Sequence, residues 1–157
     1  MKLKLRLSWD IPLRPLLCSF FLGLAFTHAV QAQDPVLGDW YTLDDDTGEI
    51  QSIVSLSLAD DGTLIGIISK LLEEADALCD KCEGDKKDKP IEGMQFIWAA
   101  KKTSEGKWEE GKILDPESGS VYNGNMTLLE DPNKLEVHGY IGISLFGRSQ
   151  VWMRVNM

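Results

Sequence analysis

The chain has 157 residues, of which 43% are hydrophobic, and a formal net charge of −9 at neutral pH. Residues 1–32 hold four basic side chains and one acidic side chain, a charge of +3, so the remainder of the chain carries −12. A surface this acidic repels phosphate backbones and anionic lipid headgroups, which argues against nucleic-acid binding and against peripheral membrane binding. The length suits one domain with a single core.

The first 32 residues have the pattern of a secretory signal peptide. Basic residues cluster in the first 14 positions, an apolar run covers residues 16–30, and Val30-Gln31-Ala32 offers small or β-branched side chains for cleavage. Because the run is short for a membrane span, we expect cleavage after Ala32. Residues 33–157 would then form one exported domain, periplasmic or secreted, without stable membrane insertion. The alternatives are an uncleaved anchor and a lipoprotein attached through Cys18.

The rest of the chain consists of short segments that are typical of strands joined by tight turns. In Ile50–Ala59, for example, Val54, Leu56 and Leu58 share one face, and Asp60-Asp61-Gly62 follows as a hairpin turn. In residues 94–101, Met94, Phe96 and Trp98 share a face. An irregular insert that contains both remaining cysteines, residues 72–93, is expected to include a short helical turn at residues 73–78. The expected strands are residues 37–43, 50–59, 63–71, 94–101, 107–114, 121–130, 134–145 and 148–155.

Consecutive antiparallel strands without helical crossovers form a meander, and eight strands can remove both sheet edges by closing into a barrel. We therefore expect an all-β fold, an eight-stranded antiparallel meander closed into a barrel with one irregular Cys-containing loop. An open bent sheet or a sandwich is the alternative. Closure would bring Trp40 of the first strand beside Arg148 or Arg154 of the last, so that an indole face could receive a guanidinium. Both arginines lie on one face of their strand, so alternation does not choose between them.

Cys79 and Cys82 are the two cysteines that follow the signal peptide. An even number of cysteines in an exported chain favours a disulfide. It would close a very small loop and would therefore stiffen that loop rather than hold the fold together. A zinc site would need further ligands, such as His138 or nearby carboxylates, and a redox pair would need a helix that starts after a strand. These two roles are the alternatives, and we expect no metal and no cofactor.

The last strand supplies the candidate ligand site. Its residues 148, 150, 152 and 154 share one face, which points inward if an arginine of this strand meets Trp40. The interior would then carry two guanidiniums, an amide and two indoles, which suits a small hydrophobic, anionic or amphipathic ligand. In the alternative, carboxylates or the Trp contact engage the arginines and the interior is filled. With two possible aromatic wall residues added, the predicted ligand-binding residues are Trp40, Trp108, Tyr122, Arg148, Gln150, Trp152 and Arg154.

No catalytic arrangement is visible in the sequence. His138 is the only histidine after residue 32, and neither a nucleophile motif nor a phosphate-binding glycine loop accompanies it. We therefore expect no catalytic residues and a non-enzymatic protein that binds a small hydrophobic or amphipathic ligand in its barrel. The alternative is a structural or interaction protein of the cell envelope with a filled barrel. The sequence indicates no specific protein partner.

Several motifs, in order along the chain, resemble those of one bacterial family. The chain resembles the domain-of-unknown-function family 2147 in Gly38–Trp40, Cys79–Gly93, Gly111–Gly119, Gly139–Gln150, and the final Trp152 and Arg154. The resemblance covers essentially all of residues 33–157. It implies an exported bacterial protein with a calycin-like, lipocalin-type β-barrel, in which the Trp of the Gly-x-Trp start packs beneath an Arg of the last strand. It implies no activity.

Overall fold

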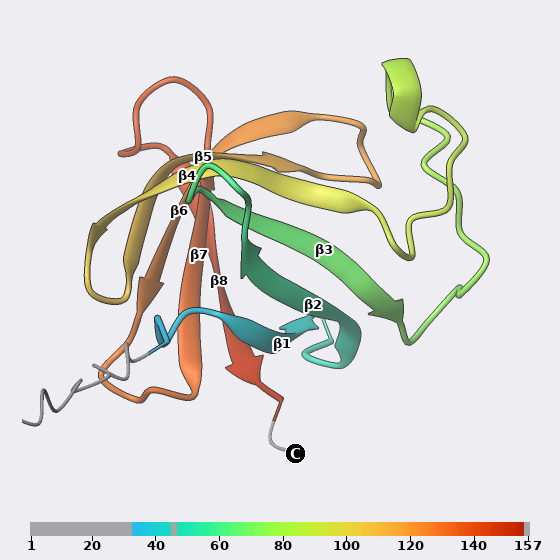
Figure 1. Cartoon of the computed structure of the whole chain (residues 1–157). Helices are drawn as coiled ribbons and strands as arrows, with labels where there is room; N and C mark the ends of the chain where they lie inside the picture. The colour runs from blue at the N-terminus through green and yellow to red at the C-terminus, as the bar shows by residue number, and fades with distance from the viewer. Residues whose placement is uncertain (1–32, 45–46, 156–157) are drawn as a thin grey trace, which may run out of the picture. The chain divides into compact units, whose positions relative to one another are not determined.

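A computed structural model describes residues 33–44 and 47–155, so the expected signal peptide lies outside the described residues and its cleavage stays a prediction. Eight antiparallel strands follow one another around a closed barrel, each paired with its neighbours in sequence (Figure 1). The predicted all-β meander barrel with an irregular Cys-containing loop is confirmed. The strands are β1 (Gly38–Leu43), β2 (Ile50–Leu58), β3 (Leu64–Leu71), β4 (Gln95–Ser104), β5 (Lys107–Leu114), β6 (Val121–Leu128), β7 (Lys134–Tyr140) and β8 (Gly147–Arg154).

Two predictions about local structure were wrong. The helical turn expected at residues 73–78 is a series of bends and turns, and a 3-10 helix, η1 (Gly84–Lys86), forms further along the same loop. The strand expected over residues 134–145 ends at Tyr140, because Gly142 adopts a φ of 75° and the following residues leave the sheet. Within residues 33–44 and 47–155, no helix is long and apolar enough to cross a membrane.

Strand β4 departs from simple alternation. The expected common face of Met94, Phe96 and Trp98 is not maintained, because the adjacent residues Phe96 and Ile97 are both buried and Trp98 is half-buried. The register with β3 shifts at this position, which marks a β-bulge. Ile97 fills the space beside Gly66, where an added Cβ would lie 3.0 Å from the isoleucine side chain.

The connections between strands gather at two ends of the barrel. The turns β2–β3, β4–β5 and β6–β7 and the segment before β1 form one end, which we call the closed end. The connections β1–β2, β3–β4, β5–β6 and β7–β8 form the other, which we call the open end (Figure 1). Fully buried side chains pack tightly in the closed half, among them Trp40, Leu64, Trp108, Met126 and Leu135.

The barrel closes between β1 and β8. In the described part of the chain, these two strands align over two residue pairs, beginning with Trp40 and Arg154, whereas β7 and β8 align over seven. Nearer the open end, the Gln150 side chain donates a hydrogen bond of 2.6 Å to the Leu43 carbonyl. A side chain therefore continues the connection beyond the paired backbone.

Candidate ligand-binding site

Trp40 and Arg154 meet at the closed end. The guanidinium carbon of Arg154 lies 4.1 Å from the centroid of the fully buried indole ring. The same guanidinium donates hydrogen bonds to the carbonyls of Pro35 and, at 3.3 Å, Leu37. Arg154, not Arg148, therefore makes the contact between the first and last strands that the sequence predicts.

The segment before β1 completes the closed end. Asp34 places its carboxylate 2.8 Å from Lys102 Nζ with only 7% of its side chain exposed, and it accepts a 2.9 Å hydrogen bond from the Val36 backbone. Burial by itself raises the pKa of Asp34, but the interactions with Lys102 and Val36 outweigh it and hold this pKa below its ordinary value. Trp108 is buried in the same half of the barrel. These residues form a packed base rather than a ligand site.

A cavity of about 920 Å³ occupies the open half of the barrel. The buried side chains of Val54, Ile68, Phe96, Val137 and Trp152 line its interior, and the rings of Phe96 and Trp152 lie 6.2 Å apart. Cavities that hold small molecules have volumes of about 300–1,000 Å³. The barrel is therefore filled at one end and hollow at the other, which argues against an interior filled along its whole length.

Four polar side chains of the cavity wall have hydrogen-bond partners within the wall. Trp152 Nε1 donates to Gln150 Oε1 at 2.6 Å, and the amide of Gln150 donates in turn to the Leu43 carbonyl. The hydroxyls of Thr42 and Ser52, both buried, lie 2.7 Å apart. Since these groups already have partners, a hydrocarbon chain can cover them without leaving a buried donor or acceptor unpaired.

The structure divides the seven predicted site residues between the two ends. Six residues of extended strand, about 20 Å, separate Arg148 at the open end from Arg154 at the closed end. The expected cavity with two guanidiniums is therefore not formed. The ligand-binding roles of all seven residues stay predictions. Tyr122, Arg148, Gln150 and Trp152 line the cavity, and Trp40, Trp108 and Arg154 belong to the closed half.

The β7–β8 loop presents an apolar surface at the mouth of the cavity. His138 holds this loop to the sheet, with one ring nitrogen 2.9 Å from the Ser144 carbonyl and the other 2.9 Å from Ser149 Oγ. Sequence reasoning missed the loop as part of the site because its apolar residues continue the pattern of β7. Exposed apolar groups this close together mark contact surfaces. Four large side chains are between 59% and 84% exposed: Ile141, Ile143, Leu145 and Phe146.

Five carboxylates also line the cavity near its mouth. They come from the β1–β2, β3–β4 and β5–β6 connections, and Arg148 is the one cationic side chain among the described lining residues. The mouth is therefore mainly negative, which differs from the cationic interior that the sequence predicts. The carboxylates are Asp44, Glu73, Glu74, Asp115 and Glu117.

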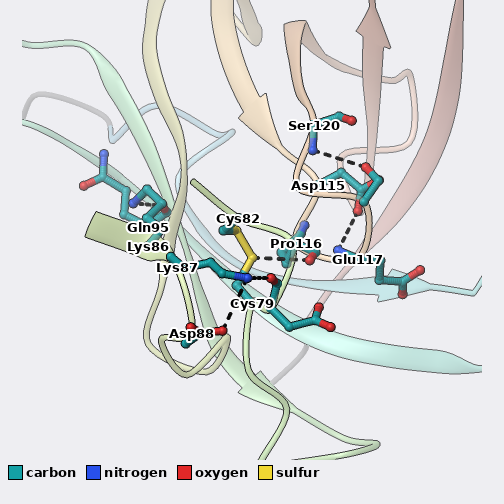
Figure 2. Close-up of a disulfide and its surroundings, with 12 residues drawn as sticks. Cys79, Cys82, Lys86, Lys87, Asp88, Gln95, Asp115, Pro116, Glu117 and Ser120 are labelled. Carbon is teal, nitrogen blue, oxygen red and sulfur yellow. Dashed lines mark hydrogen bonds and ion pairs between the residues drawn. A yellow bond between two sulfur atoms is a disulfide. The ribbon is translucent and has the colours of Figure 1, made fainter. Parts of the chain in front are cut away.

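A disulfide between Cys79 and Cys82 fixes one side of the mouth. Their Cα atoms are 5.3 Å apart and both side chains are buried. Figure 2 shows the loop against the β5–β6 turn, where Cys79 Sγ lies 3.3 Å from the Pro116 carbonyl oxygen. Gly119, with a φ of 72°, approaches the Lys81 backbone so closely that a Cβ would overlap it. No group of three or more potential metal ligands gathers in the part of the chain that the structure describes.

Comparison with known proteins agrees with this architecture. The profile of the family described as "Uncharacterized protein conserved in bacteria (DUF2147)" matches residues 38–154. Among solved structures, protein HP1028 from Helicobacter pylori, described as a member of the lipocalin family, superposes with a TM-score of 0.66. The alignment covers 76% of this chain and 82% of HP1028 at 15% identity, a likeness that shows the fold alone. No curated protein matches the chain. The chain belongs to the bacterial family DUF2147 and folds as a lipocalin-like barrel.

Proposed function

We propose that this protein binds a small hydrophobic or amphipathic molecule in the open half of its barrel, without catalysing a reaction on it. The observation that supports this proposal most directly is the cavity of about 920 Å³, with its buried apolar wall. Eight-stranded barrels have an interior wide enough for one small ligand, as in lipocalins. We place this binding outside the cytoplasm, on the expectation that residues 1–32 are a cleaved signal peptide.

The expected affinity follows from the apolar area that a ligand would bury. Each buried methylene contributes about 0.8 kcal/mol, so a chain of about ten carbons contributes about 8 kcal/mol. Loss of translational and rotational freedom offsets part of this contribution. Since about 8 kcal/mol corresponds to a dissociation constant of about 1 μM, micromolar affinity is the upper limit for an alkyl chain of this length, and weaker binding is expected.

Binding is tested with N-phenyl-1-naphthylamine, a neutral apolar dye that fluoresces when it leaves water. We expect the purified protein to bind it, and Val137→Trp, which fills the cavity, to weaken binding at least about tenfold, a loss of about 1.4 kcal/mol. Val151→Trp is the matched control, because Val151 neighbours this region on β8 but is 39% exposed and does not line the cavity. Absence of dye binding, or equal loss in both folded variants, would contradict the proposal. If the dye binds as expected, native mass spectrometry of protein purified from its source would identify a retained molecule.

A further inference from the structure

We infer that the molecule bound in the cavity is a cationic amphipath, whose alkyl chain lies in the barrel and whose positively charged head group lies among the carboxylates of the mouth. This inference rests on the proposed function, because it specifies the class of ligand for the same cavity. Three observations support it: the apolar interior, the sign of the charge at the mouth, and the exposed apolar loop beside those charges.

The interior suits an alkyl chain and offers no charged partner at its base. The side chains of four polar residues are bonded within the wall, namely Gln150, Trp152, Thr42 and Ser52. The Arg154 guanidinium is held at the closed end. A charged head group at the base would lose its hydration without gaining an opposite charge, which is strongly unfavourable. The head group of any amphipath in this cavity therefore belongs at the mouth.

The mouth carries five carboxylates and one guanidinium among the described lining residues. Asp115 is engaged within its own turn, by the Ser118 hydroxyl at 2.6 Å and the Glu117 backbone at 3.0 Å. Glu73 and Glu74 are exposed at the edge of the cavity, and Glu117 accepts one 3.2 Å hydrogen bond from a glutamine side chain. These three glutamates retain acceptor capacity for an ammonium group, since a carboxylate has about four lone-pair positions.

Asp44 and Arg148 each have a partner already, so the preference does not depend on either of them being available. An anionic head group would meet this excess of carboxylates and the charge of −12 carried by residues 33–157, whereas a cation is attracted by both.

The β7–β8 loop covers the part of an alkyl chain nearest the head group. Ile141 and Phe146 line the cavity and are 72% and 74% exposed, so a ligand would bury apolar surface that is otherwise in water. A cationic amphipath matches both parts of the mouth at once, with its head group among carboxylates and its first carbons against this loop. A purely apolar ligand would make no electrostatic interaction with the carboxylates, and an anionic ligand would be repelled by them.

The test compares three ligands with the same decyl chain and different head groups: decyltrimethylammonium, decyl maltoside and decyl sulfate, all below their micelle concentrations. Each displaces N-phenyl-1-naphthylamine from the purified protein. We expect the cation to displace the dye at about tenfold lower concentration than the anion, with the neutral ligand between them. Raising the ionic strength from about 0.01 M to about 1 M shortens the Debye length from about 30 Å to about 3 Å and should largely remove this difference.

Two variants separate a local effect from the total charge. One replaces the three rim glutamates with glutamines, and the other removes three charges from the turns of the closed end. We expect the rim variant to lose the preference for the cation and the control to change it less than about twofold, because screening and distance weaken remote charges. The rim variant is Glu73→Gln, Glu74→Gln and Glu117→Gln, and the control is Asp60→Asn, Glu105→Gln and Glu130→Gln.

The outcomes distinguish this inference from the function on which it rests. If the three decyl ligands displace the dye equally, or if both variants reduce the preference equally, the inference about ligand charge is wrong while binding in the cavity stands. If neither the dye nor any decyl ligand binds, the proposed function itself is wrong.

Discussion

Replacing Arg154 should destabilise the barrel far more than replacing Arg148, although both arginines lie on the same face of β8. Arg154 contacts the face of Trp40 and bonds to the backbone of the segment before β1, so it joins the last strand to the first. Arg148 lies at the exposed rim of the open end, in a strand that pairs fully with β7. The two alanine variants remove the same side chain from opposite ends of one strand.

The expected size of the effect follows from these contacts. A partly desolvated cation–π contact contributes about 1 kcal/mol. The two part-buried hydrogen bonds to Pro35 and Leu37 contribute about 1 kcal/mol each, and the exposed hydrogen bond to the Pro132 carbonyl adds little. Arg154→Ala should therefore lower the free energy of unfolding by about 3 kcal/mol, and Arg148→Ala by less than about 1 kcal/mol.

Urea denaturation, followed by tryptophan fluorescence and circular dichroism, measures both values. With an m value of about 2 kcal/mol/M, Arg154→Ala should move the midpoint by about 1.5 M at unchanged m. Arg154→Lys should fall between wild type and alanine, because an ammonium keeps the charge but lacks the planar donor set. Equal destabilisation by Arg148→Ala and Arg154→Ala would refute the assignment of barrel closure to Arg154.

Three further predictions concern other parts of the fold. Gly119→Ala should destabilise the protein by about 2 kcal/mol or more in thermal unfolding, since its positive φ and its contact with the disulfide loop leave no room for a Cβ; an unchanged melting temperature would contradict this packing. Because the folded-state pKa of Asp34 is depressed, its ion pair with Lys102 stabilises the protein above pH 3.8 and is lost as the pH falls through the folded pKa. Asp34→Asn should therefore lose less stability than wild type on acidification below that pH. If the free energies of unfolding of the two proteins fall equally as the pH is lowered, the ion pair does not contribute as argued. His138→Ala should speed amide hydrogen exchange in residues 141–146 without affecting the core strands, whereas unchanged exchange would show that the loop is held otherwise.

The strands that the sequence predicts best are those whose faces differ in environment. β2 was expected over residues 50–59 and spans Ile50–Leu58, because its regular alternation and the Asp-Gly turn that follows leave little freedom. β7 was predicted too long, since residues 141–145 continue an apolar pattern although they lie in solvent. Composition shows that a residue is apolar, and it does not show whether the fold buries it.

The candidate site was predictable in part for a similar reason. Alternation assigns Arg148, Gln150, Trp152 and Arg154 to one face of β8, and the structure places Gln150 and Trp152 in the cavity wall. Alternation carries no information about depth along the barrel, so the two arginines were expected together. The acidic mouth could not be predicted, because closure brings together carboxylates from connections far apart in sequence.

The short alignment between β1 and β8 gives the barrel unequal stiffness along its axis. At the closed end, backbone pairing and the Trp40–Arg154 contact hold the two strands, whereas nearer the open end the side-chain amide of Gln150 bonds to the Leu43 carbonyl. Within the described residues, side-chain interactions such as this hydrogen bond, about 1 kcal/mol each, join the two strands there in place of a strand ladder. We therefore expect the mouth to adapt to head groups of different widths, while the base keeps its dimensions.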